Sequence, residues 1–137
     1  MKVPLDLLPN PFEVPVWWGM ESPITREEVQ QALDTGDFHT TPIEPKFMNP
    51  DPREVHVRRV AYLVQKGWTD AIFVEPWMGN WPIQDGNHRL AAAHFRRDPD
   101  IEVNFGGFLD DIRMAYGDDI AEQAEKEWNA GVEEEHD

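Results

Sequence analysis

Apolar residues recur every three or four positions in several stretches of the chain, which is the spacing of one buried helix face. Val57, Val60 and Ala61 make the clearest pattern of this kind, in a segment that a glycine closes. This spacing predicts helices at residues 25–36, 52–67, 87–97, 108–116 and 118–129.

The first two predicted helices also carry start signals. Thr25 followed by Glu28 predicts a capping box, in which each side chain accepts a hydrogen bond from the backbone N–H of the other residue. Asp51 is placed to cap the second helix, with Pro52 at its first position and Glu54 in its first turn. These signals fix where both helices begin.

Alternating or continuous apolar runs predict the strands. Ile101, Val103 and Phe105 alternate with polar residues, as in a half-buried strand. Further strands are predicted at 40–48, at a sheet edge because of its prolines, and at 71–74 and 81–84, with a hairpin-like turn at 78–80. The order of elements predicts one α+β domain, a small mixed β-sheet packed with helices.

The two ends of the chain differ in composition from its middle. Residues 1–23 contain five prolines, a density that resists helix and central strand and predicts an extended arm. Trp17 and Trp18 make this arm too apolar for a free tail, so it packs across the domain or against a partner subunit, which allows a homodimer. Helices over 108–130 precede an acidic tail, 131–137, that is expected to be frayed and solvated.

Composition excludes several classes of function. The chain has no cysteine, which excludes disulfides, thiolate zinc sites and thiol catalysis and suits a cytoplasmic protein. Its formal net charge of −15 repels nucleic-acid phosphate and argues against broad nucleic-acid binding, while it could attract a basic protein partner. No apolar run approaches the length that spans a bilayer, and no signal peptide is visible.

A short strand that ends on a glycine leads directly into an alanine-rich helix between Trp81 and Phe95. The turn reads Asp85-Gly86-Asn87-His88-Arg89. Unpaired backbone N–H groups at the start of a helix favour binding of an anion. The guanidinium of Arg89 could form paired hydrogen bonds to a phosphate, and His88 could donate a hydrogen bond or transfer a proton. The turn therefore predicts an oxyanion or phosphate site. A purely structural explanation is equally compatible: a glycine turn, an asparagine cap and two solvated side chains.

The residues Asp85 to Ala93 resemble the signature turn of the ParB/sulfiredoxin superfamily. The nearest form is the Asp-Gly-His-His-Arg turn of the ParB-like free serine kinases, from which this chain departs at Asn87. Asn87 also stands where sulfiredoxin has its nucleophilic cysteine, which excludes that enzyme's chemistry. The resemblance covers Thr41 to Gly107 and implies a ParB/sulfiredoxin-like fold that cradles nucleotide phosphates.

The resemblance also implies roles for individual residues. Asp85 would hold Mg²⁺ or orient a hydroxyl, and His88 would donate to a phosphate oxygen. Glu44 would match a family glutamate in the strand region before the turn, with Glu75 as a rival position. The ligand would be ATP, ADP or CTP, and the reaction phosphoryl transfer or hydrolysis. The residues expected to bind the nucleotide are Gly86, Asn87, His88, Arg89 and Arg59, the last from a basic cluster with His56 and Arg58 on the outer or flanking face of the second helix.

Two alternatives remain open from the sequence. The first is a non-enzymatic interaction protein, such as a phage- or plasmid-type inhibitor or regulator, that uses its acidic surface or the tryptophan-containing arm. The second is a ParB-like nuclease, which the acidic balance opposes because a nuclease must hold a polyanionic substrate.

Overall fold

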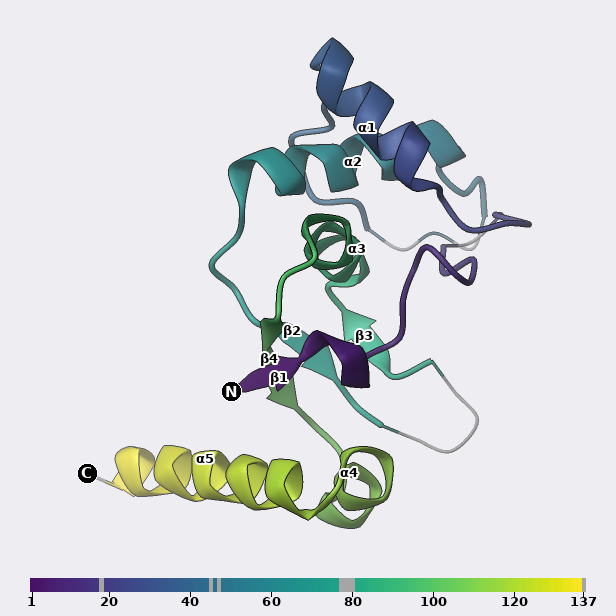
Figure 1. The fold of residues 1–137 in the computed structure, drawn as a ribbon. Coiled ribbons are helices and arrows are strands. Elements are labelled where there is room, and N and C mark those ends of the chain that lie inside the picture. The colour runs from purple at the N-terminus through teal and green to yellow at the C-terminus, as the bar shows by residue number, and fades with distance from the viewer. Residues whose placement is uncertain (18, 45, 47, 77–80, 137) are drawn as a thin grey trace.

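The computed structural model describes residues 1–17, 19–44, 46, 48–76 and 81–136, and has an α+β fold (Figure 1). A small mixed sheet lies between two groups of helices. In chain order the elements are β1 (Lys2–Pro4), the 3₁₀ turn η1 (Leu5–Leu7), α1 (Arg26–Thr35), α2 (Arg53–Lys66), β2 (Ile72–Val74), β3 (Ile83–Asp85), α3 (Asn87–Arg96), β4 (Asp100–Phe105), α4 (Leu109–Tyr116) and α5 (Asp118–His136).

The sheet has four strands in the order β1-β4-β2-β3. β2 pairs antiparallel with β3, α3 then returns the chain, and β4 runs parallel to β2. β1 pairs antiparallel with the other edge of β4, with Val3 opposite Ile101. Burial alternates along β1, β2 and β4, so their buried side chains share one face of the sheet, and Glu102 and Asn104 of β4 are exposed on the other.

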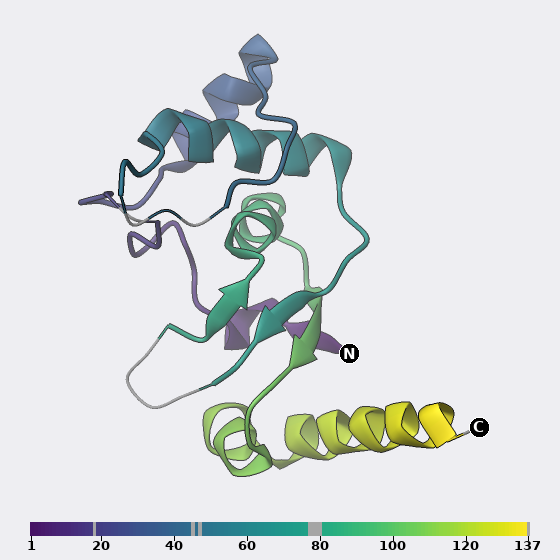
Figure 2. The ribbon, with the colours of Figure 1, turned by 180° about the vertical axis from the view of Figure 1, so that it is seen from behind.

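Helix α3 lies between the sheet and α2, as both ribbon views show (Figures 1 and 2). Its Leu90 and Ala93 belong to the core that the sheet forms, whereas Ala91 and Ala92 belong to a second core with α1 and α2. All four side chains are completely buried. The alanines therefore allow layers on both sides to pack closely against the helix backbone.

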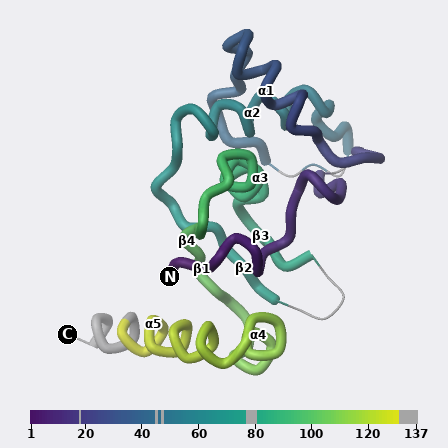
Figure 3. Tube along the Cα trace, viewed as in Figure 1, coloured from purple at the N-terminus to yellow at the C-terminus, as the bar shows by residue number. Residues whose placement is uncertain are grey.

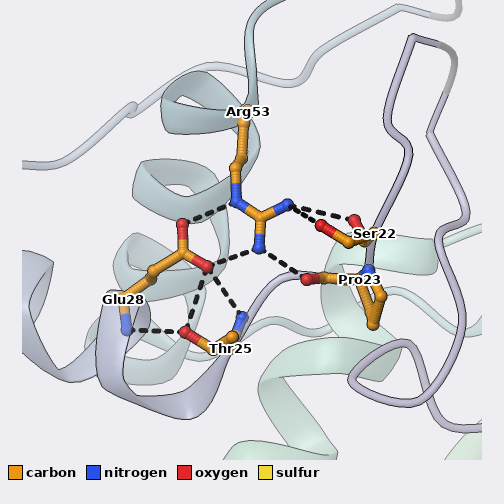
Figure 4. Close-up of polar contacts among 5 residues, drawn as sticks. All are labelled: Ser22, Pro23, Thr25, Glu28 and Arg53. Atoms are coloured by element: carbon orange, nitrogen blue, oxygen red, sulfur yellow. Dashed lines mark hydrogen bonds and ion pairs between the residues drawn. The ribbon is translucent and has the colours of Figure 1, made fainter.

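Helices α1 and α2 are joined by a cluster of polar contacts (Figure 4). The predicted capping box of Thr25 and Glu28 is present, and Gly36 ends α1 in the left-handed conformation. Arg53, the first residue of α2, donates its Nε–H to Glu28 Oε2 at 2.7 Å and Nη1 to the carbonyl oxygen of Ser22 at 3.0 Å. One guanidinium thus fixes the starts of both helices.

Helices α4 and α5 lie beyond the end of β4, on the opposite end of the molecule from α1 and α2 (Figure 3). Ile112 of α4 and Ala121 of α5 are fully buried in the core that contains the sheet. Trp128 of α5 donates its indole N–H to the carbonyl oxygen of Phe105 at 3.1 Å, which ties α5 to the end of β4. Within the described residues, no helix combines the length and apolar character that crossing a membrane requires.

Several predictions about individual elements were wrong. The described residues of 40–48 form no strand, and the strand beside β4 is instead formed by β1 near the start of the chain. Asp51 does not cap α2: the N-cap is Pro52, and the Asp51 carboxylate accepts from Lys46 at 3.3 Å. The last helix continues to His136, past the end predicted at Asn129. The predicted turn at 78–80 lies outside the described residues.

Candidate functional site

The turn between β3 and α3 has the backbone of an anion site. Gly86 has φ = +106°, and a Cβ there would lie 2.4 Å from Cγ2 of Ile72, so glycine is required for both conformation and space. α3 begins immediately afterwards at Asn87. Within the described residues, the backbone N–H groups of residues 87–89 find no acceptor, because Gly86 has no side chain to cap them.

These amides adjoin a cavity of about 330 Å³. The cavity brings together five residues predicted from the sequence: Glu44, Asp85, Gly86, Asn87 and His88. Its wall is completed by aromatic, apolar and charged residues from the arm, the segment before α2, α2 itself and β3. These are Val16, Trp17, Ile43, Lys46, Pro50, Asp51, His56, Trp81, Ile83 and Gln84. The predicted Arg59 and Arg89, and the rival Glu75, are not part of this wall.

Two histidines from different helices meet at the cavity. Nδ1 of His56 on α2 lies 2.9 Å from Nε2 of His88 on α3, so one shared hydrogen joins the rings. The ring of Trp17 stacks on both, with centroid distances of 4.8 Å to His56 and 4.6 Å to His88. His56 is only 5% exposed, which corrects its predicted place on the outer face of the helix.

The surroundings keep this histidine pair neutral. Burial lowers the pKa of His88 well below its ordinary value, and His56, Arg59, His39 and Arg89 lower it further. Burial also lowers the pKa of His56, which the nearby Asp51 carboxylate partly opposes. The pair therefore presents neutral rings rather than a fixed positive charge near neutral pH.

Arg89 connects the turn to the start of β2. Its Nη1 donates to the carbonyl oxygens of Asp70 and Ala71, both at 3.0 Å, and its Nη2 donates to Asp85 Oδ2 at 3.2 Å. The Arg89 side chain is 17% exposed. Three of its five N–H donors are thus directed at protein acceptors behind Gly86, which gives the guanidinium a bracing role.

Arg59 lies on α2, one turn after His56. Its guanidinium stacks on Tyr62 at 5.4 Å, and burial lowers its pKa, with Arg89 lowering it further. Among the described residues, Nη1 of Arg59 is a buried side-chain nitrogen without a hydrogen-bond partner. Arg58, by contrast, pairs on the surface with Asp37 at 3.1 Å.

Asn87 is held by its neighbours and does not cap α3. Trp81 donates its indole N–H to Asn87 Oδ1 at 2.7 Å, and Asn87 Nδ2 donates to the carbonyl oxygen of Ile83 at 3.4 Å. This arrangement turns the side chain back toward β3 and leaves the first amides of the helix free of it.

The carboxylates at the cavity rim do not form a metal cage. Asp85 is engaged by Arg89, Asp51 pairs with Lys46 at 3.3 Å, and Glu44 is exposed. No group of three or more potential metal-ligating side chains occurs in the part of the chain that the structure describes. The described residues therefore do not fit a resident Mg²⁺, including at Asp85.

Sequence reasoning did not assign ten residues of the cavity wall to the site, and three of them, His56, Trp17 and Trp81, contact Asn87 or His88. The signal for His56 was available, because it precedes Val60 and Leu63 by four and seven positions and so shares their buried helix face. Nothing in the local pattern could place Trp17, which reaches the site from about 40 positions before His56.

Comparison of the chain with protein-family models, curated proteins and solved structures found no match.

Proposed function

We propose that the cavity at the start of α3 binds the phosphate of a nucleotide, such as ATP, ADP or CTP. The observation that carries this proposal is the set of free amides at residues 87–89 beside a cavity of about 330 Å³. Their N–H groups and the helix dipole favour negative charge, and Lys46 is a cation in the same cavity wall. The resemblance of the turn to the ParB/sulfiredoxin signature supports the same ligand class.

The remainder of the cavity suits the less polar part of such a ligand. Trp17 and Trp81 provide aromatic surface, and Ile43 and Ile83 add aliphatic wall. A pocket of this size, with apolar surface beside polar groups that can orient a ligand, is compatible with a small-molecule site. The phosphate would lie at the amides, and a base or sugar would contact the aromatic side.

Phosphoryl transfer is a further step of the same proposal. Asp85, His88 and Glu44 line the cavity and remain our candidates for orienting a hydroxyl or water and for moving a proton. A neutral His88 is able to accept a proton, as a general base must. Release of inorganic phosphate from ATP or CTP, and its loss in Glu44→Gln, would test this step separately from binding.

The binding proposal is tested by placing one negative charge in the cavity wall, near the amides. Asn87→Asp keeps the acceptor for the Trp81 N–H, changes the shape of the side chain little, and gives up the 3.4 Å hydrogen bond to the carbonyl oxygen of Ile83. We expect it to weaken nucleotide binding by at least tenfold, because charges about 8 Å apart repel by about 2 kcal/mol at an effective dielectric constant of about 20.

Gln123→Glu on α5 is the matched control, since it adds the same charge at an exposed position outside the cavity wall. Titrations of labelled ATP and CTP with magnesium would measure both variants beside the unchanged protein. Equal affinity of the two variants, or no binding by the unchanged protein, would refute the site.

A second candidate function is binding of a basic protein partner. Two large apolar side chains, Phe108 and Met114, are 76% and 83% exposed. They flank carboxylates in the first turns of α4 and α5. We propose this surface for a partner with basic and apolar residues. A pull-down in which Phe108→Ser and Met114→Ser retain the partner of the unchanged chain would refute this surface.

A further inference from the structure

We propose that His56 and His88 act as one proton acceptor coupled to the cavity, and that the pair takes up one proton when an anion binds. The inference rests on the proposed anion site and adds its regulation. It makes the affinity of the site for an anion depend on pH.

The geometry of the pair supports a single exchangeable proton. With 2.9 Å between Nδ1 of His56 and Nε2 of His88, one nitrogen donates and the other accepts. A second proton placed between the rings would set two N–H groups against each other, so an added proton must enter at an outer nitrogen. His56 is 5% exposed yet lines the cavity, and within the described residues its Nε2 has no hydrogen-bond partner.

Charges around the pair oppose an added proton until an anion arrives. His39, Arg59 and Arg89 face it from the loop before α2, from α2 and from α3, and they disfavour an imidazolium. The carboxylate of Asp51 favours an imidazolium at His56. Glu44, Lys46 and Asp85 share the cavity wall. An anion at residues 87–89 adds negative charge beside His88, and Trp17 offers a ring face that attracts a stacked cation.

The sign of the pH dependence follows from these opposing effects. In the free protein burial holds the pKa of His88 well below its ordinary value, so the pair is neutral. A bound anion raises the pKa of the pair, and at any pH between the free and bound values binding takes up a proton. Affinity therefore falls as pH rises through that interval, by at most about tenfold per pH unit.

Sulfate is the probe, because it does not titrate in the range where histidine does. Calorimetric titrations in two buffers of different ionisation enthalpy, across about pH 5 to pH 8, give the number of protons taken up per sulfate. We expect a value that approaches one in the acidic part of this range. Sulfate binding with no proton uptake at any pH would overturn the inference and leave the anion site intact.

Variants separate the pair from the rest of the site. His88→Gln places an amide near the position of Nε2, and His56→Asn places one near Nδ1, so each retains the hydrogen bond without the titration. The double variant, which carries both substitutions, is expected to abolish proton uptake and flatten the pH profile, and the two single variants show which ring takes the proton. His94→Gln is the control: His94 is on the same helix, its Nε2 bonds the carbonyl oxygen of Pro9, and we expect the pH profile to be retained.

Nitrogen NMR of the free protein tests the pairing independently of any ligand. One hydrogen-bonded N–H shared between His56 and His88, with both rings neutral at pH 6.5, is the expected result. Independent titration of the two rings near their ordinary pKa would overturn the pairing. Absence of sulfate and nucleotide binding at every pH would instead overturn the proposed anion site and this inference together.

Discussion

The bracing role of Arg89 can be measured as stability. Arg89→Met keeps an apolar stem of similar length and removes the donors to the carbonyl oxygens of Asp70 and Ala71. Hydrogen bonds from a charged donor contribute about 1.5–3 kcal/mol each. Asp70 is exposed, so water partly replaces its lost bond, and the ion pair with Asp85, which is 79% exposed, adds little. We expect Arg89→Met to lower the free energy of unfolding by about 2–4 kcal/mol.

Urea denaturation followed by circular dichroism is the assay, with the midpoint and slope compared between variants. Arg58→Met is the control, because that side chain is 43% exposed and pairs only with Asp37, which is 57% exposed. It should cost at most about 1 kcal/mol. A loss in Arg89→Met that does not exceed the loss in Arg58→Met would refute the brace.

This result would also decide how the nucleotide site is tested. If Arg89 braces the start of β2, its removal lowers both stability and binding, and the binding loss alone does not identify a ligand contact. Asn87→Asp is the more direct variant, because it leaves the bonds of Arg89 in place.

Two further predictions concern the turn and the helix starts. Gly86→Ala should lower the midpoint of thermal unfolding much more than Gly36→Ala, because a Cβ at Gly86 meets Ile72 whereas one at Gly36 meets nothing within 4 Å. Thermal unfolding of both variants measures this difference, and equal shifts of the two midpoints would contradict it. The hydrogen bond from Arg53 is the main cause that lowers the pKa of Glu28 below its value in the unfolded chain. The pair therefore stabilises the fold at pH values above the unfolded pKa, and this contribution is lost as the pH falls through the folded pKa. Glu28→Gln should therefore cost about 1 kcal/mol at neutral pH and progressively less in acid, as urea midpoints at several pH values would show, whereas a gap independent of pH would contradict it.

Local signals in the sequence correctly predicted the elements whose structure depends on residues that are neighbours in the chain. Thr25 and Glu28 form the predicted capping box, and the alternation of Ile101, Val103 and Phe105 corresponds to β4. In these segments the side-chain pattern and the backbone hydrogen bonds are set within a few positions of each other. The same holds for the helix that starts at Asn87.

Long-range pairing explains the errors. A strand requires a partner edge, and the edge of β4 is occupied by β1, which was predicted to be part of an extended arm. Pro42 also lacks the N–H donor that a strand at 40–48 would need there. The prolines had already placed the predicted strand at a sheet edge, whereas the pairing of β1 with β4 is not visible from apolar spacing.

The residues of the candidate site also differ in whether local sequence or long-range packing places them. The turn sequence predicted four contiguous residues that share one cavity, Asp85 to His88, and the family resemblance added Glu44 to the same cavity. The direction of Arg89 could not be predicted, since it depends on where the carbonyl oxygens of Asp70 and Ala71 lie after β2 pairs. Trp17 likewise reaches the histidines only through the tertiary packing of the arm.

The two-sided burial of α3 has a consequence for the turn that precedes it. Because Leu90 and the alanines at 91–93 are in contact with layers on both sides, α3 has no free face along which to slide or roll. Its first amides are therefore held stationary by the whole molecule, and a ligand that binds them meets donors already oriented. Little conformational entropy need be lost at this position on binding, which lets a ligand be retained by few contacts.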